Sequence, residues 1–245
     1  MKLTWLCPTW NRPECLRGLV RQFLAQDFQA NEIELLILDD SGQYKNQSGD
    51  NGSGGKRWQI ISFNRPFATL GDKYNAMLSM VDSDAVAIAE DDDLYSPQHS
   101  SACIHALQFG DTCKPTCVMV EHRGLHEESD PGRFHASMAM NTAFLKRIGG
   151  WPATKQANFD LQMIAKLRSS GTVVCPQQGI IYSPDGSSRL APEQHIRFNP
   201  TYTFRWETTG HYHGQAYGSG PLDEGWLEKA RIASGPIRYV GNLFQ

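Results

Sequence analysis

Four acidic residues follow an apolar run in the segment AIAEDDDLYSP, residues 87–97. They are Glu90, Asp91, Asp92 and Asp93. Like charges this close repel and raise each other's pKa, so the folded chain must offset the cost. A solvated turn, or an acidic N-cap for a helix starting near Ser96, would account for one or two of them. A hard divalent cation such as Mg²⁺ or Mn²⁺ would account for all four, and the pattern favours a metal site.

Two other groups of polar residues follow apolar runs nearer the N-terminus. The segment PTWNRPE, which begins at Pro8, comes after the run KLTWLC. Asp39 and Asp40 end the run IELLILDD. A polar strand end that leads into a turn would explain this acid pair by itself. Beside the other two groups, the pair is better explained as part of a binding site.

Strand and helix signals alternate around these residues. Apolar runs predict strands at residues 2–7, 33–40, 58–63, 85–90, 116–122, 136–140, 172–175 and 179–183. Helical patterns are predicted from Pro13 onward, at 70–81, about 96–109, up to Gly149-Gly150 and at 157–170. Residues 41–57 are rich in Gly, Ser and Asn and predict a mobile loop.

This alternation predicts an α/β fold with a mostly parallel, twisted sheet flanked by helices. In such sheets, ligands bind beyond the carboxyl ends of the strands. Residues 8–12, Asp39-Asp40 and the acids at 90–93 would therefore line one cleft. After about Ser183 the periodicity is lost, and the remainder is rich in Gly, Pro and aromatic residues. It predicts an irregular tail that folds back over the cleft.

Length and composition exclude several classes of protein. The 245 residues, 40% of them hydrophobic, suit one large domain better than two small ones. The net charge of −3 gives no reason to expect non-specific binding to nucleic acid or an anionic membrane. No apolar run approaches the roughly 20 residues of a membrane span, and the N-terminus lacks a signal-peptide pattern. The six cysteines form no C-x-x-C pair, which is typical of reduced thiols in a cytoplasmic protein.

The order of these motifs resembles that of the GT-A fold glycosyltransferases that use nucleotide sugars, especially glycosyltransferase family 2. The matching pieces are CPTWNRPECL, LLILDDSG, FNRPFATLGDKYNAML, AIAEDDDLYSP, and IGGW followed by ANFDLQ. The resemblance covers roughly residues 3–183 and implies a GT-A-like (Rossmann-like) catalytic core at 1–183. Its nucleotide-binding half would be about 1–95 and its acceptor half about 96–183. Residues 184–245 would form a tail or lid of the same domain.

The resemblance implies that AIAEDDDLYSP holds the family's D-x-D element with its trailing proline. Setting Pro97 against that proline places the element at Glu90-Asp91-Asp92, with Glu in place of the first Asp. Asp92 is then the preferred ligand for Mn²⁺ or Mg²⁺, with Asp93 in support and Glu90 on the ribose side. Sliding the register by one residue would exchange these roles. A C-terminal histidine completes the metal shell in several GT-A enzymes, and the candidates here are His213 and His211.

The resemblance also implies a nucleotide pocket around the ends of the first two strands. Asp39 and Asp40 would contact the base and the ribose. Cations near a helix N-terminus suit a diphosphate, and Arg65 and Lys73 lie near the start of the helix at 70–81. The other side of the base pocket would be formed by Pro8, Thr9, Asn11 and Arg12.

An inverting transfer needs a carboxylate that takes the proton of the acceptor hydroxyl. The family has an acid pair shortly before an aromatic residue and an acid-leucine step. On ANFDL that pair falls on Ala157 and Asn158, and an asparagine cannot accept the proton. Asp160 is therefore the expected base, in a shifted register. Two alternatives stay open: Glu121 supplies the base, or the enzyme is retaining.

The motifs together predict a metal-dependent glycosyltransferase that moves a sugar from a nucleotide sugar, preferably a UDP-sugar, to a hydroxyl acceptor. The acceptor would be a glycan or, as for some bacteriophage enzymes, a modified DNA base. Arginines alternate with aromatic residues in the tail, which suits phosphate contacts and base stacking, although tail packing also explains the aromatics. These residues are Arg189, Arg197, Phe198, Tyr202, Phe204, Arg205 and Trp206. The alternatives are a nucleotidyltransferase, whose usual glycine-rich loop PTWNRPE lacks, and a non-catalytic nucleotide- or nucleic-acid-binding protein.

Overall fold

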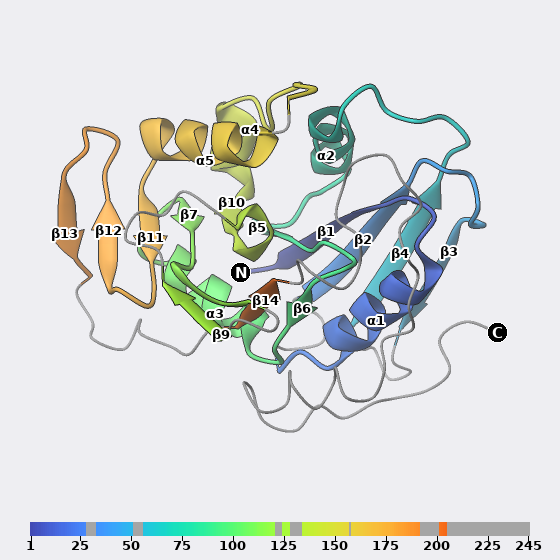
Figure 1. Ribbon diagram of the computed structural model, residues 1–245, viewed down its shortest axis with the longest axis horizontal. Helices are drawn as coiled ribbons and strands as arrows, with labels where there is room; N and C mark the ends of the chain where they lie inside the picture. The colour runs from blue at the N-terminus through green and yellow to red at the C-terminus, as the bar shows by residue number, and fades with distance from the viewer. Residues whose placement is uncertain are drawn as a thin grey trace.

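The computed structural model describes residues 1–27, 33–50, 56–120, 124–127, 134–156, 158–191 and 201–204. In this part of the chain, a large sheet crosses the molecule with helices on both sides, and a smaller sheet completes the fold (Figure 1). The structure confirms the expected α/β class with a large, mostly parallel sheet flanked by helices.

Across the described residues, the large sheet has ten strands in the order β13-β12-β11-β7-β10-β5-β1-β2-β4-β3. Its central strands β5, β1, β2 and β4 are parallel neighbours. Strands β10, β12 and β3 run opposite to the others. The strands are β1 (Leu3–Thr9), β2 (Ile33–Asp39), β3 (Gln47–Asp50), β4 (Arg57–Ser62), β5 (Ala85–Ile88), β7 (Thr112–Cys113), β10 (Ala139–Asn141), β11 (Val173–Cys175), β12 (Ile180–Tyr182) and β13 (Ser188–Leu190).

The smaller sheet joins segments that are far apart in the sequence. Its order is β6-β14-β8-β9, with bounds Leu94–Tyr95, Tyr202–Phe204, Cys117–Val120 and Gly124–Glu127. Strand β14 is antiparallel to β6 and parallel to β8. Because β6 directly follows the acidic run, this pairing brings Tyr202 close to the acids.

The helices lie along the two sides of the large sheet. Figure 1 shows α2, α4 and α5 above the sheet and α1 and α3 below it. Their bounds are α1 (Pro13–Leu24), α2 (Leu70–Ser79), α3 (His99–Leu107), α4 (Thr142–Arg147) and α5 (Phe159–Ser170), with a 3-10 turn η2 (His135–Ser137) before β10.

Helix α1 shows how the apolar spacing builds the core. Its first residue is Pro13, whose fixed φ and missing N–H suit a helix start. The side chains that recur at three- and four-residue spacing, Leu16, Leu19 and Phe23 among them, are fully buried. Phe23 packs edge-on against Trp5 of β1, with ring centroids 5.6 Å apart. Each such side chain stabilises the fold by about 1.5–3 kcal/mol relative to exposure.

Helix α2 is fixed against the segment that precedes α5. A side chain at Gly71 would lie 2.0 Å from the carbonyl oxygen of Pro152, so only glycine fits there. The Asn75 side chain accepts from the backbone N–H of Trp151 at 2.8 Å and donates to its carbonyl at 2.9 Å. These contacts hold Tyr74 of α2 next to Trp151.

The expectation of a mobile loop at 41–57 is wrong for residues 47–50. They form β3, an edge strand antiparallel to β4. An edge strand is held by backbone hydrogen bonds and needs few apolar side chains, so a polar composition does not prevent it. Gly49 is required, because a Cβ there would lie 2.6 Å from the Trp58 ring. Residues 51–55 lie outside the described residues.

Regular structure also continues beyond Ser183. Strand β13 forms a hairpin with β12 through a turn at Gly186, whose φ is +85°. Strand β14 follows, so the described parts of the expected irregular tail contain two strands. The helix expected from about Ser96 begins at His99, because residues 94–95 pair in β6. Among the residues described, no helix is long and apolar enough to cross a membrane.

Candidate active site

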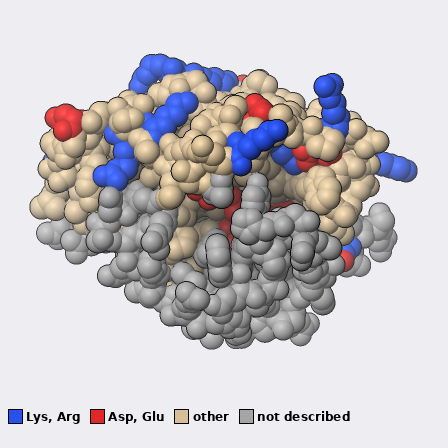
Figure 2. Space-filling view, turned by 45° about the horizontal axis from the view of Figure 1, so that its top comes forward, with Lys and Arg blue, Asp and Glu red and all other residues tan. Residues whose placement is uncertain are grey.

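The expected cleft lies at one edge of the sheet, where three adjacent strands end. Strands β5, β1 and β2 are parallel neighbours, and Thr9 of β1 pairs with Asp39 of β2. The carboxyl ends of parallel strands meet at the same edge, so the segments that follow them come together there. Figure 2 shows acidic side chains set back between the surrounding residues on this side of the molecule.

The first strand end is tied directly to the acidic run. The Thr9 hydroxyl donates to the Asp91 carboxylate at 2.5 Å. The Arg12 guanidinium donates to Asp91 at 2.9 Å and to Asp92 at 2.8 Å. Asp91 and Asp92 are each 4% exposed, so this arginine partly offsets the repulsion between two buried carboxylates.

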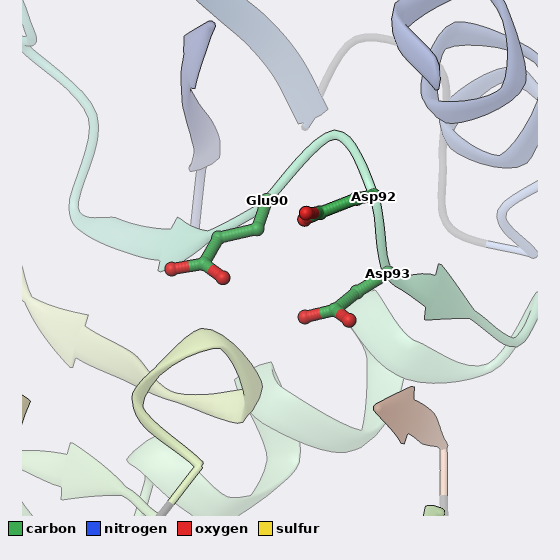
Figure 3. A group of neighbouring side chains, drawn as sticks. All are labelled: Glu90, Asp92 and Asp93. Atoms are coloured by element: carbon green, nitrogen blue, oxygen red, sulfur yellow. The ribbon is translucent and has the colours of Figure 1, made fainter. Parts of the chain in front are cut away.

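The other acids form a cluster that Asp91 does not join. Carboxylate oxygens of Glu90, Asp92 and Asp93 lie within 4.8 Å of one another. Figure 3 shows the three side chains pointing into one space from the turn between β5 and β6. Of the expected D-x-D element, the structure therefore gathers Glu90 and Asp92 with Asp93, and turns Asp91 toward Thr9 and Arg12.

Strand β14 reaches this cluster through Tyr202. The Tyr202 hydroxyl donates to the Asp93 carboxylate at 2.6 Å, and both side chains are buried. A second tyrosine contacts the first acid of the run: the backbone N–H of Glu90 donates to the Tyr95 hydroxyl oxygen at 2.9 Å. The contact from β14 therefore holds Asp93 on the side of its carboxylate that carries Oδ2.

Burial and crowding change the acidity of the cluster. Burial raises the pKa of Glu90 well above the usual range of a glutamate, and the nearby carboxylates of Asp93 and Asp160 raise it further. Burial also raises the pKa of Asp91, while Arg12 acts in the opposite direction. A bound cation would favour the ionised form of these carboxylates, because it is an opposite charge at short distance.

The second strand end is also held by internal contacts. Asp39 is fully buried. Its carboxylate accepts hydrogen bonds from Ser41 and Gly42, which form an Asx-turn, and from the Ser62 hydroxyl. Asp40 is 7% exposed and accepts from the backbone N–H of Phe67 at 2.9 Å.

Lys73 of α2 joins the first two strand ends. Its ammonium group pairs with the Asp40 carboxylate and donates to the carbonyl oxygen of Thr9 at 2.6 Å. Three of the expected nucleotide contacts, Asp40, Lys73 and Thr9, therefore lie together. Of the other expected contacts, Arg12 and Asp39 are held as described above, Pro8 is partly buried at the end of β1, and Asn11 and Arg65 are exposed. Asn11 has a left-handed backbone with φ 54°.

Asp160 lies in the first turn of α5 with half of its side chain exposed. Its charge contributes to the raised pKa of Glu90, so the two carboxylates are close enough to interact electrostatically. Asn158, which stands where the family has an acid, is the N-cap residue of α5, and its side chain accepts from Gln162 at 2.8 Å. The expected alternative base Glu121 and the histidines His211 and His213 lie outside the described residues and stay predictions.

The sequence analysis did not assign several of the residues that lie at this site. Tyr202 is 2% exposed and bonded to Asp93, so it is not available for the base stacking considered for the tail. Tyr74 and His135 are fully buried and electrostatically coupled to Asp160; Tyr74 lies in the segment FNRPFATLGDKYNAML, whereas no motif marks His135. Trp151, in the IGGW segment, also had a sequence signal.

Solved structures with similar folds include proteins in complex with nucleotide sugars. Residues 1–349 of Staphylococcus aureus TarS, in complex with UDP-GlcNAc, superpose with a TM-score of 0.59 at 16% identity. That match covers 95% of this chain and 65% of TarS 1–349. The mannosyltransferase PcManGT from Pyrobaculum calidifontis, in complex with GDP-Man and Mn²⁺, gives a TM-score of 0.53 at 13% identity, over 80% of this chain and 58% of that one.

The chain thus spans less than two thirds of the length of these solved proteins. No curated protein sequence matches it. The sequence profile of glycosyl transferase family 2 matches residues 4–143, which include β1, the acidic cluster and β10. The chain belongs to glycosyl transferase family 2.

Proposed function

We propose that this protein is a metal-dependent glycosyltransferase that moves a sugar from a nucleotide sugar, preferably a UDP-sugar, to a hydroxyl acceptor. The observation that carries the proposal is the cluster of Glu90, Asp92 and Asp93 at the carboxyl end of β5. Like charges held this close to one another are costly, and a bound cation gives a reason to retain them.

The donor set suits a hard divalent cation. Three carboxylates offer the oxygen ligands that Mg²⁺ and Mn²⁺ prefer, and their 4.8 Å spread is close to the span of ligands on one ion, about 4–5 Å. Asp92, Asp93 and Glu90 would hold the metal, and Tyr202 would orient Asp93 from behind. When bound, the ion would act as a Lewis acid and stabilise the charge that develops on the leaving diphosphate.

The donor nucleotide would lie against the ends of β1 and β2. The neighbours with similar folds were solved with UDP-GlcNAc and with GDP-Man, which supports a nucleoside diphosphate sugar as the class of donor. Arg12 lies beside Asp91 and Asp92 and is placed to contact a phosphate that shares the metal. Asp40, held by Lys73, would contact the ribose or the base.

Asp160 would be the general base of an inverting transfer. Its half-exposed carboxylate interacts electrostatically with Glu90 of the cluster, so an acceptor hydroxyl could lie between Asp160 and the donor sugar. As the acceptor oxygen attacks the anomeric carbon, Asp160 takes the hydroxyl proton and the bond from that carbon to the diphosphate oxygen breaks.

The acceptor would be a glycan or a modified DNA base. Arg189 is exposed on β13, as a phosphate contact would require, whereas the other arginines considered for that surface lie outside the described residues. A nucleotidyltransferase or a non-catalytic binding protein would use the same strand ends, and the experiment below separates them.

Thermal shift against UDP, GDP, CDP and dTDP, each with and without Mn²⁺, tests the donor site. We expect UDP to stabilise the protein by several degrees only when Mn²⁺ is present, since the diphosphate and the carboxylates share the ion. Asp92→Asn should lose this shift, while Asp82→Asn, which changes a 92% exposed acid beside β5, should keep it. No shift with any diphosphate would contradict a nucleotide-sugar enzyme and favour a non-catalytic protein.

Turnover distinguishes the enzyme classes. Release of UDP from a UDP-sugar should fall at least about 100-fold in Asp92→Ala, because one charge-stabilising centre of this kind contributes that much or more. Unchanged turnover in Asp92→Ala would refute the metal assignment. Release of pyrophosphate from a nucleoside triphosphate and a sugar phosphate would instead identify a nucleotidyltransferase.

A further inference from the structure

A buried histidine lies behind Asp160. His135 is 1% exposed and sits in η2, directly after Phe134, whose φ of 56° is unusual for a residue with a side chain. Its ring packs edge-on against Tyr74, Phe159 and Trp151, with centroid distances of 5.6, 5.4 and 6.4 Å. Tyr74 in turn stacks on Trp151 at 4.8 Å. The imidazole therefore has one fixed plane.

The hydrogen-bond partner of Nε2 determines which ring nitrogen of His135 carries the hydrogen. The Trp151 indole N–H lies 2.9 Å from Nε2 of His135. An indole can only donate, so Nε2 carries the lone pair and, in a neutral ring, Nδ1 carries the hydrogen. Burial lowers the pKa of His135 to about 4, with Asp160 acting to raise it and Lys114 to lower it. At neutral pH the ring is neutral, and Nδ1–H is a donor.

This donor has no hydrogen-bond partner among the described residues. An unpartnered buried donor costs about 1–3 kcal/mol, so its position calls for an explanation. The nearest ion-pair partner is Asp160, whose Oδ1 lies 3.9 Å from Nδ1. That separation is too long for a hydrogen bond. The Asp160 side chain is 53% exposed, so a change of rotamer would close the gap at little cost.

We propose that His135 is a positioning residue that donates its Nδ1–H to one oxygen of Asp160, so that the other oxygen faces the acceptor hydroxyl. The inference rests on the proposed function, in which Asp160 is the general base. In this arrangement, Trp151 donates to His135, and His135 in turn donates to Asp160. The aromatic packing fixes the imidazole, and the imidazole fixes the carboxylate, as outer partners fix ligands and bases at other sites.

Two substitutions separate the two nitrogens. The amide nitrogen of asparagine lies near the position of Nδ1, whereas the amide of glutamine reaches the position of Nε2. His135→Asn keeps a donor toward Asp160 but leaves Trp151 unpartnered. His135→Gln keeps an acceptor for Trp151 but removes the donor.

Release of UDP from the UDP-sugar, with water as acceptor, measures the consequence. We expect kcat to fall about 10-fold in His135→Gln with KM unchanged, because outer-shell contacts are typically worth 10- to 100-fold. His135→Asn should retain kcat within about 3-fold, although its Tm falls because a buried N–H loses its partner. Equal kcat in the two variants, or a loss that follows Tm, would overturn the proposal.

The same assay with Asp160→Asn keeps this inference distinct from the proposed function. If Asp160→Asn loses turnover and His135→Gln does not, the inference fails and the base assignment stands. If Asp160→Asn keeps turnover, the base assignment and this inference both fail, while the metal and donor sites still stand on the thermal shifts. In the Asp160→Asn background, His135→Gln should cause no further loss, because its effect passes through that carboxylate.

A spectroscopic readout does not depend on turnover. In ¹⁵N-histidine-labelled protein, the His135 ring should show the neutral Nδ1–H pattern, assigned by its absence in His135→Gln. Asp160→Asn should shift the Nδ1 resonance and leave that of Nε2 nearly unchanged. An Nε2–H pattern, or an Nδ1 resonance insensitive to Asp160, would overturn the proposal.

Discussion

Both ends of the parallel strands carry charged side chains, but the two sets lie in different environments. At the amino end, Lys2 pairs with Glu34 and Asp82, and Arg57 of β4 pairs with Glu34. These side chains are between 26% and 92% exposed. A hollow of about 580 Å³ that includes Glu34, Arg57 and Asp82 lies at this end.

At the carboxyl end, the charges are withdrawn from water. Asp40, Lys73, Asp91 and Asp92 are each less than 8% exposed. Removing a charge from water costs several kcal/mol, and pairing recovers only part of it. The fold keeps this cost at one end of the sheet and avoids it at the other. Buried charge therefore coincides with the proposed active-site end of this sheet, whereas the hollow lies at the other end.

The largest stability effect is expected at the buried pair of Lys73 and Asp40. Lys73→Met should lower the free energy of unfolding by about 3–5 kcal/mol, because it leaves a buried carboxylate without its counter-charge. Urea unfolding followed by circular dichroism measures the change. Adding Asp40→Asn to Lys73→Met should recover part of the loss, since the uncompensated charge is then gone. A loss below about 1 kcal/mol would place this pair with the exposed pairs of the amino end.

A matched pair of tyrosines tests the value of a single contact at the carboxyl end. Tyr202→Phe removes a hydrogen bond to the buried Asp93 and should cost about 2 kcal/mol in unfolding free energy. It should also weaken Mn²⁺ binding about 10-fold, because Asp93 loses its outer partner. Tyr74→Phe removes a buried hydroxyl with no partner among the described residues, so stability should stay the same or rise slightly. Equal losses in the two variants would show that the Asp93 contact has no special value.

The sequence predicted the site down to its strand ends but not to its individual contacts. Acids that directly follow apolar runs, such as Asp39 after IELLIL and Glu90 after AVAIA, predict strands that end together at one edge. The direction of each acid in a run depends on the turn that follows. Asp91 and Asp92 look equivalent in sequence, yet only Asp92 joins Glu90 and Asp93. Nothing in the periodicity of this acidic run distinguishes Asp91 from Asp92.

Contacts from distant segments were beyond any local pattern. Tyr202 reaches Asp93 because two residues of β14 pair with β6 across more than one hundred positions, and a three-residue strand has too few residues to show alternation. His135 lies in a single 3-10 turn and is oriented by Trp151 from another segment. Such positions are determined by tertiary packing, not by local propensity.

The titration of Glu90 should have a smaller effect on the free energy of unfolding at each pH step, and this effect depends on whether a cation is bound. The native pKa of Glu90 is raised above its unfolded value, mainly by burial and then by Asp93. The folded state therefore binds this proton more tightly, and stability is lost as the pH rises from about 4.5 through the raised pKa. Within that range, metal-free protein should accordingly lose about 1.4 kcal/mol of unfolding free energy for each step of one pH unit.

Saturating Mn²⁺ should cancel this pH dependence, because the ion replaces the proton as the partner of the carboxylates. Glu90→Gln should flatten the curve of metal-free protein without any ion. Chemical unfolding at a series of pH values measures both. A metal-free protein whose stability rises steadily between pH 5 and 8 would contradict the raised pKa.

The smallest effect on the free energy of unfolding is expected at the amino end of the strands. It is the reference against which the carboxyl end is compared. Lys2→Met removes two exposed ion pairs, to Glu34 at 3.1 Å and to Asp82 at 3.6 Å. Water already solvates these groups and salt screens them, so the free energy of unfolding should change by less than about 1 kcal/mol. The UDP and Mn²⁺ thermal shifts should stay as in the wild type, since this end of the sheet contributes nothing to the cluster. A loss comparable to that of Lys73→Met would mean that burial does not separate the two ends, and the hollow lined by Glu34 and Arg57 would then have to be considered as a second site.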